Sequence, residues 1–167
     1  MGYTTIFDGQ ISVEPPLNPE EITYLKKFAN TRRMACEQGP YYANRGRFCG
    51  EKPNDPEIFN YNTPPDGQPS LWCDWVPTED GAAIEWNGAE KFHDADEWMQ
   101  YLIDHFIGGA PQAKTALSFL QGHTLNGEIE ARGEDPDDRW KLVVEDNGVF
   151  VAEGSIVYSE PRTVHPC

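Results

Sequence analysis

The chain has 167 residues, of which 28 are acidic and 13 are basic, so its formal net charge is −15. This length is typical of one domain, and a hydrophobic share of 38% supplies enough apolar side chains for a core. The negative charge disfavours binding to nucleic acid or to anionic lipid. No stretch of the sequence approaches the ~18 apolar residues of a membrane helix, so we expect one acidic globular domain that does not bind membranes.

The first predicted element is a β-strand over residues 3–13, because its residues alternate with the period of two that places every second side chain on one face. That face contains Tyr3, Thr5, Phe7, Gly9, Ile11 and Val13. Two prolines follow and end this strand. A helix is then expected over residues 19–34. Its start carries Asn18 as N-cap, Pro19 as first helical residue and Glu21 as the third residue of a capping box.

Residues 35–70 show no sustained periodicity and are rich in glycine and proline, which predicts a long irregular loop within the domain. Its aromatic residues favour packing over disorder. We interpret four of them as a second small core against the strand that follows. They are Tyr41, Tyr42, Phe59 and Tyr61.

A β-hairpin is expected next, with strands over residues 71–76 and 82–86 and a turn at residues 78–81. A helix then begins at Asp94, its predicted cap, and ends at the glycine pair 108–109. The predicted inner stripe of this helix contains Trp98, Met99, Leu102, Ile103 and Phe106.

A third helix is predicted over residues 111–121. Three more strands are predicted at residues 125–132, 140–145 and 149–152. The pair Asn147-Gly148 indicates a tight hairpin turn between the last two of them. Residues 155–158 add an edge strand or belong to a C-terminal tail.

The predicted fold belongs to the α+β class, with an antiparallel sheet and two to three helices packed on one face. Without the third helix, the first six elements follow the split βαβ order of ferredoxin-like domains. We expect a single domain over residues 1–153 and an edge strand or tail over residues 154–167. Residues 8–13 and 126–131 have similar sequences, which is weak support for an internal duplication.

Several motifs along the chain are shared with a known family. They are MGYTT at 1–5, TRRM at 31–34, GQPxLWCxWVPTEDG at 67–81, EKF at 90–92, the segment 98–106 and GEDPDDR at 133–139. With these motifs the chain resembles a family of small uncharacterised proteins encoded by actinobacteria and their phages. The resemblance implies a protein that acts inside the bacterial cell, in the cytoplasm of the host. It carries over no activity and no catalytic residue.

The first candidate for partner binding is the aromatic group around the predicted hairpin. Trp72 and Trp75 must point to opposite faces of one strand, so one of them is exposed unless the 35–70 loop covers it. Tyr61 of that loop joins this group. Aromatic side chains are common anchors of protein interfaces, so the alternative to a second core is a recognition surface.

The second candidate for partner binding is the acidic loop that contains Asp135, Asp137 and Asp138. These carboxylates suit a partner with a basic surface, although a solvated hairpin loop explains them as well. The EF-hand spacing of a calcium site is absent, and the four cysteines show no CxxC pair, so we expect no metal site and free thiols.

A site between the 35–70 loop and the sheet is the alternative, and it would suit a small enzyme or a small-ligand binder. Its candidate polar residues are Arg45, Arg47, Asp74 and His93. A nucleophilic pair of Cys73 and His93 is a further hypothesis for this site. The sequence contains no phosphate loop, dinucleotide fingerprint, zinc-protease motif or nucleophile elbow, so no cofactor is indicated.

These observations favour a non-enzymatic acidic protein that binds another protein and inhibits or regulates it. No catalytic residue is predicted. The sequence does not define the oligomeric state.

Overall fold

The structure is a computed structural model that describes residues 3–43, 58–60 and 62–164. Its strands are β1 (Ile6–Glu14), β2 (Ala35–Cys36), β3 (Ile58–Asn60), β4 (Trp75–Pro77), β5 (Ala83–Trp86), β6 (Thr124–Arg132), β7 (Arg139–Glu145) and β8 (Gly148–Gly154). Its helices are α1 (Pro19–Ala29) and α2 (Ala95–Leu102), which continues as a π-helix (Ile103–Ile107), and a short 3-10 helix (Gln112–Thr115). In this part of the chain no helix is long and apolar enough to cross a membrane.

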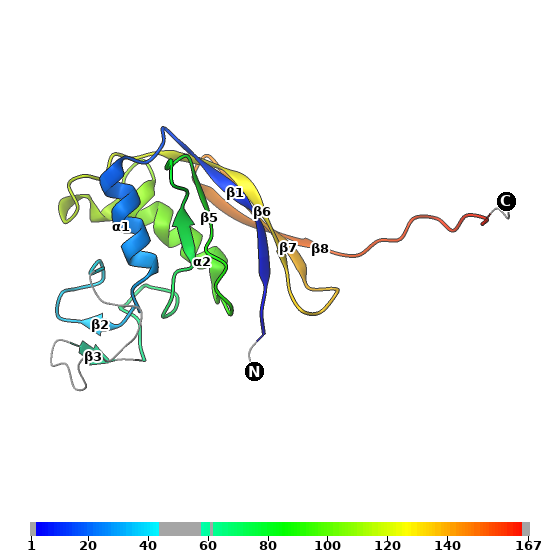
Figure 1. The fold of residues 1–167 in the computed structure, drawn as a ribbon, viewed down its shortest axis with the longest axis horizontal. Helices are drawn as coiled ribbons and strands as arrows, with labels where there is room; N and C mark the ends of the chain where they lie inside the picture. Colours follow the sequence, from blue (N-terminus) through cyan, green and yellow to red (C-terminus); the bar gives the residue numbers. More distant parts are fainter. Residues whose placement is uncertain (1–2, 44–57, 61, 165–167) are drawn as a thin grey trace.

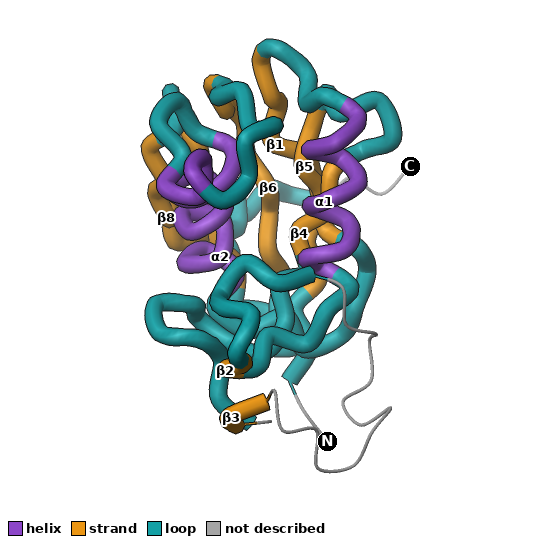
Figure 2. The backbone as a smooth tube through the Cα atoms, turned by 90° about the vertical axis from the view of Figure 1, so that its left-hand side faces the viewer, coloured by secondary structure: helices purple, strands orange, loops and turns teal. Residues whose placement is uncertain are grey.

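Six strands form one antiparallel sheet in the order β4-β5-β1-β6-β7-β8, and β2 and β3 form a separate ribbon (Figure 1). Both α-helices lie on one face of the sheet (Figure 2). The predicted α+β class is therefore confirmed. The placement of β5 between β4 and β1, and of β6 on the other side of β1, is compatible with a ferredoxin-like arrangement. Membership of that fold family stays a prediction, and β7 and β8 extend the sheet beyond it.

The two segments with similar sequences, 8–13 and 126–131, lie side by side in the centre of the sheet. Gln10 pairs with Glu128, and on either side a glycine pairs with an isoleucine. A Cβ atom on Gly9 would lie 2.7 Å from the Glu128 carbonyl oxygen, and one on Gly127 would lie 2.7 Å from the Gln10 carbonyl oxygen. The two glycines thus allow β1 and β6 to approach closely. Their positions are related by a local twofold axis at the pair of Gln10 and Glu128.

Helix α1 begins as the sequence predicts. Asn18 Oδ1 accepts a hydrogen bond from the Glu21 amide at 2.8 Å, and Glu21 Oε1 accepts one from the Asn18 amide at 2.9 Å. The helix ends at Ala29 rather than at the predicted residue 34. The chain leaves the helix there because Arg33 is buried and its amide donates to the Leu71 carbonyl at 2.7 Å.

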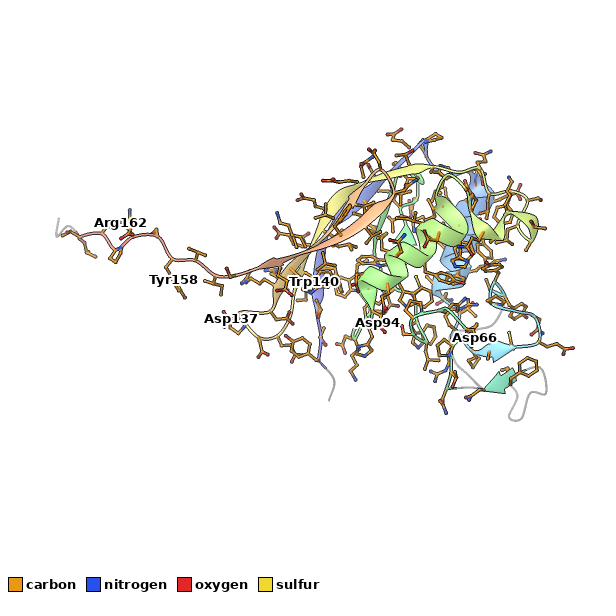
Figure 3. The ribbon with its side chains drawn as sticks, turned by 180° about the vertical axis from the view of Figure 1, so that it is seen from behind. Asp66, Asp94, Asp137, Trp140, Tyr158 and Arg162 are labelled. Atoms are coloured by element: carbon orange, nitrogen blue, oxygen red, sulfur yellow. The ribbon has the colours of Figure 1, made fainter. Side chains whose placement is uncertain are left out.

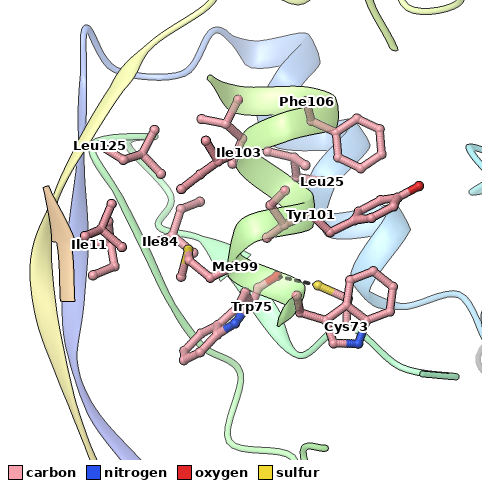
Figure 4. Packing of buried hydrophobic residues seen from close by; sticks show 14 of the residues in the cluster. Ile11, Leu25, Cys73, Trp75, Ile84, Met99, Tyr101, Ile103, Phe106 and Leu125 are labelled. Atoms are coloured by element: carbon pink, nitrogen blue, oxygen red, sulfur yellow. Dashed lines mark hydrogen bonds between the residues drawn. The ribbon is translucent and has the colours of Figure 1, made fainter. Parts of the chain in front are cut away.

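The core lies between the sheet and the helices. The five residues of the predicted inner stripe of the second helix are all buried, which confirms that prediction. Figure 4 shows Met99 and Ile103 facing Ile11, Ile84 and Leu125 of the sheet. The predicted cap is wrong in detail, since Asp94 has a left-handed backbone and its side chain makes no capping hydrogen bond.

The predicted third helix over residues 111–121 is wrong, because only the 3-10 helix forms there. Tertiary hydrogen bonds occupy the backbone that a helix would use. The Phe119 carbonyl accepts from Asn18 Nδ2 at 2.9 Å, and the Gln121 amide donates to Glu21 Oε2 at 3.2 Å. The first strand of the predicted hairpin is also shorter than expected, since β4 begins at Trp75.

The predicted C-terminal hairpin forms, but its two turn residues are Asp146 and Asn147 (φ 46° and 71°), and Gly148 pairs with Glu145 as the first residue of β8. The predicted edge strand at 155–158 does not form within this chain. Residues 155–164, which we call the C-terminal arm, are exposed along their whole length and have no regular structure. The arm extends away from the body of the molecule (Figures 1 and 3).

Candidate functional site

The acidic candidates lie beside a surface hollow of about 410 Å³. We call it the acidic hollow, and it is lined by Asp96, Asp137, Asp138, Arg139, Trp140, Val151, Glu153 and Gly154. Four acidic residues from α2, the loop after β6 and strand β8 thus line one hollow together with Arg139 and Trp140. Figure 3 shows Asp137 and Trp140 between the start of the arm and Asp94 at the start of α2.

The loop that supplies Asp137 and Asp138 is held in place by the N-terminal segment. Tyr3 Oη donates to Asp138 Oδ2 at 2.6 Å and accepts from the Asp135 amide at 3.1 Å. The Thr4 amide donates to Glu134 Oε1 at 3.0 Å. These contacts fix the loop while Asp135 and Asp137 stay exposed.

Negative charge is concentrated where α2 begins. Partial burial and the neighbouring carboxylates of Asp94 and Asp96 raise the pKa of Glu97. The hydrogen bond to Asp138 raises the pKa of Tyr3. Of these carboxylates at the start of α2, Asp96 lines the hollow, where it would attract a positively charged group.

The aromatic candidates do not form one surface. Trp75 is only 1% exposed, its ring contacts Phe7 and Phe92, and its Nε1 donates to the Ala95 carbonyl at 2.8 Å. It therefore acts as a core residue and gives no support to a role in partner binding. Trp72 is half-buried, and Tyr61 lies outside the described residues.

The interpretation of the loop aromatics as a second core is wrong for Phe59, which is 71% exposed. Tyr41 is half-buried but packs on the helices, with its ring 5.4 Å from that of Phe106. Its hydroxyl lies 2.8 Å from His105 Nδ1. The beginning of the loop therefore packs on α1 and on the π-helix that continues α2.

A second and larger depression of about 660 Å³ lies between α1, the start of the 35–70 loop and the segment before β6. We call it the tyrosine groove, because Tyr24, Tyr41 and Tyr42 line it together with Leu117 and Phe119. The Tyr24 hydroxyl donates to the Tyr41 carbonyl at 2.5 Å and so joins two of its walls. The groove adjoins the loop as the alternative hypothesis expects, but its other walls are not the sheet.

Comparison with protein-family models, with curated proteins and with solved structures gives no match for this chain. The resemblance to the family of actinobacteria and their phages therefore stays an expectation from the sequence motifs.

The polar residues predicted for a ligand site are not brought together at the groove. Asp74 is buried, and its Oδ1 accepts from Asn87 Nδ2 at 3.2 Å. His93 is exposed, and neither residue lines the groove. Arg45 and Arg47 lie outside the described residues.

Buried Arg33, which the sequence analysis did not single out for this role, supports one wall of the groove. Its Nη2 donates to the carbonyls of Pro40 and Tyr42 at 3.0 and 2.6 Å, and its guanidinium lies 4.0 Å from the centre of the Phe28 ring. Burial lowers the pKa of this guanidinium. An arginine in the TRRM motif was visible in the sequence, but its burial depends on how the 35–70 loop folds back over it.

The hypothesis of a nucleophilic Cys73–His93 pair is not supported. Cys73 is fully buried, and its thiol donates to the Trp75 carbonyl (Figure 4). Burial raises the pKa of Cys73 to about 12, so the thiol stays protonated at neutral pH. Within the described ranges no cluster of three or more His, Cys, Asp or Glu side chains is arranged to hold a metal ion.

His123 and Glu21 form a buried pair that sequence reasoning missed. His123 Nε2 lies 2.9 Å from both Glu21 carboxylate oxygens, and Nδ1 lies 2.6 Å from the Pro15 carbonyl. Because Glu21 also belongs to the capping box, this pair ties the start of α1 to the segment before β6. Its role is structural, since both side chains are buried away from either depression.

Proposed function

We propose that this protein is a non-enzymatic binding protein of a bacterium or phage that acts in the cytoplasm and inhibits or regulates another protein through a basic segment of that protein. The acidic hollow is the proposed contact site. The observation that carries the proposal is the convergence of Asp96, Asp137, Asp138 and Glu153, from three separate parts of the chain, around Trp140.

The chemistry of the hollow suits a lysine or arginine side chain. Its carboxylates attract the cation, and the half-buried Trp140, which also packs on Phe7, adds an aromatic side chain that a guanidinium can contact. The net charge of −15 adds long-range attraction, which raises the rate of encounter with a basic partner.

The test uses a short arginine-rich peptide as probe and isothermal titration calorimetry as readout. Asp137→Lys changes an exposed residue of the hollow, and Glu79→Lys is the matched control, exposed in the turn after β4. Both variants change the net charge equally. We expect Asp137→Lys to weaken binding about three- to tenfold more than Glu79→Lys does.

Equal losses in the two variants would contradict the proposal, because they would show that only net charge attracts the peptide. Binding that is unchanged in Asp137→Lys would contradict it as well. Circular dichroism of both variants confirms that the fold is retained.

A second candidate function is the binding of a small apolar ligand in the tyrosine groove. Its volume of about 660 Å³ lies within the range of roughly 300–1,000 Å³ that is usual for ligand pockets. Ala116 and Ser118 are both exposed, but only Ala116 lines the groove. If the groove binds apolar ligands, Ala116→Arg abolishes binding of a fluorescent apolar probe and Ser118→Arg does not.

A further inference from the structure

Strand β8 is an open edge of the sheet with unusually exposed apolar side chains. Phe150 and Val151 are 56% and 48% exposed, although they lie on opposite faces of the strand. The described residues contain no strand that pairs with its outer edge. An open edge of this kind is a template for pairing with another chain.

The arm that continues β8 carries the same residue types in reverse order. Residues 150–158 read F-V-A-E-G-S-I-V-Y, so an aromatic residue, a valine and an aliphatic residue flank Gly154 on both sides. Ile156, Val157 and Tyr158 of the arm are 38%, 83% and 87% exposed. When two copies of such a nearly palindromic segment pair antiparallel, residues of similar type lie opposite each other.

We propose that two copies of this chain form a dimer by antiparallel pairing of residues 150–158, with Gly154 opposite Gly154 of the second copy. This register follows from the sequence order around Gly154. It places Phe150 opposite Tyr158, Val151 opposite Val157, Ala152 opposite Ile156 and Glu153 opposite Ser155.

The pairing explains the exposed apolar residues on both faces of the segment. Val143 already pairs with Phe150 within the chain, so Tyr158 of the second copy extends an apolar row on the outer face. Val157 of the second copy extends the opposite face beside Val151. Cross-strand apolar and aromatic pairs of this kind stabilise a sheet.

The backbone is compatible with this register. Pairs that share hydrogen bonds alternate along β7 and β8 from the tight turn, beginning with Glu145 and Gly148. The amide and carbonyl groups of Val151 and Glu153 therefore point to the open edge. They meet those of Val157 and Ser155 of the second copy, so each chain completes the hydrogen bonds of the other.

The register also limits repulsion between two chains that each carry a net charge of −15. Glu153 faces a serine and not its own copy, and glycines meet at the twofold axis. Repulsion between the two bodies remains, so dimerisation should strengthen when salt screens it.

The first test measures the mass of the full chain by sedimentation equilibrium over a range of protein concentrations and salt. We expect a dimer that dissociates on dilution. Val157→Pro removes an amide that the pairing needs and should give a monomer, whereas Thr163→Pro, outside the paired segment, should leave the dimer. A monomer at every concentration, or a dimer that persists in Val157→Pro, would overturn the proposal.

The second test fixes the register by disulfide formation in a chain that also carries Cys49→Ser and Cys167→Ser. Residues opposite each other without shared hydrogen bonds have Cα atoms about 4.5 Å apart, which a disulfide can span. A Cβ on Gly154 would lie 3.4 Å from the Arg139 carbonyl oxygen, an ordinary contact, so Gly154→Cys should fold.

Gly154→Cys should therefore form a disulfide-linked dimer, and Ala152→Cys alone should not. Cross-linking of Ala152→Cys should appear only when Ile156→Cys is added. Cross-linking of Ala152→Cys alone, or none in Gly154→Cys, would overturn the register.

Discussion

The two edges of the sheet are built in different ways. Strand β4 has three residues, ends in a proline and is anchored by Trp75 under the start of α2. Strand β8 has seven residues, is exposed along most of its length and continues into an apolar arm. Short strands and prolines are common means of protecting an edge from other chains. Because β8 lacks both, its exposed side chains are available for an interface and contribute little to the core.

Truncation of one aromatic residue at each edge tests this comparison most strongly. Trp75→Ala removes a ring that is buried among Phe7 and Phe92, so we expect a loss of about 3–5 kcal/mol in the free energy of unfolding. Phe150→Ala in the monomeric Val157→Pro background should cost no more than about 0.5 kcal/mol. Urea denaturation measures both. Similar losses at the two positions would show that β8 belongs to the core after all.

A change at the centre of the sheet should have an intermediate effect. Gly127 has a φ of 149° and leaves no room for a Cβ next to the Gln10 carbonyl oxygen. We expect Gly127→Ala to cost about 1–3 kcal/mol, because it forces β1 and β6 apart. Gly88→Ala is the control for backbone strain alone, because Gly88 has a φ of 85° and no atom within 4 Å of an added Cβ. Hydrogen exchange should show faster opening of β1 and β6 than in the unmodified protein.

The smallest expected effect concerns pH and the helix side of the molecule. Burial lowers the pKa of His105 on the π-helix below its ordinary value. The folded state therefore binds fewer protons here than the unfolded state, and this contribution to stability falls as pH decreases through about 6.5. His105→Gln should remove that part of the pH dependence, measured as urea midpoints between pH 7.5 and 5. An unchanged pH profile in the variant would show that His105 does not titrate on unfolding.

Local signals in the sequence predicted several elements correctly. The capping box at Asn18 and Glu21, the apolar stripe from Trp98 to Phe106 and the turn at Asn147 all depend on residues close together in the chain. The position of the turn was predictable to within one residue, since the left-handed backbone falls on Asp146 and Asn147 and not on Gly148.

The errors have a different physical origin. Residues 116–121 have helical spacing, but hydrogen bonds with the side chains of Asn18 and Glu21 hold them in another conformation. Helix α1 ends early because the Arg33 amide donates to the carbonyl of Leu71, 38 residues later in the chain. Contacts between residues far apart in the chain decide both cases, and no local pattern reports them.

The candidate site was predictable only in part. The acidic loop was visible in the sequence, and it supplies Asp137 and Asp138 to the hollow. Asp96, Trp140 and Glu153 join them only because α2, β7 and β8 meet at this end of the sheet. Trp140 is the second residue of β7, which directly follows the acidic loop. This closeness in the sequence was the one available signal.

The position of Val151 and Glu153 has a consequence for affinity. These two residues line the acidic hollow and also belong to the proposed paired segment. A twofold axis perpendicular to the sheet would place both hollows of a dimer on the same face. A partner with two basic segments at a suitable spacing would then bind bivalently, because attachment of the first segment raises the effective concentration of the second. Avidity of this kind would couple recognition of a basic partner to the assembly state of the protein.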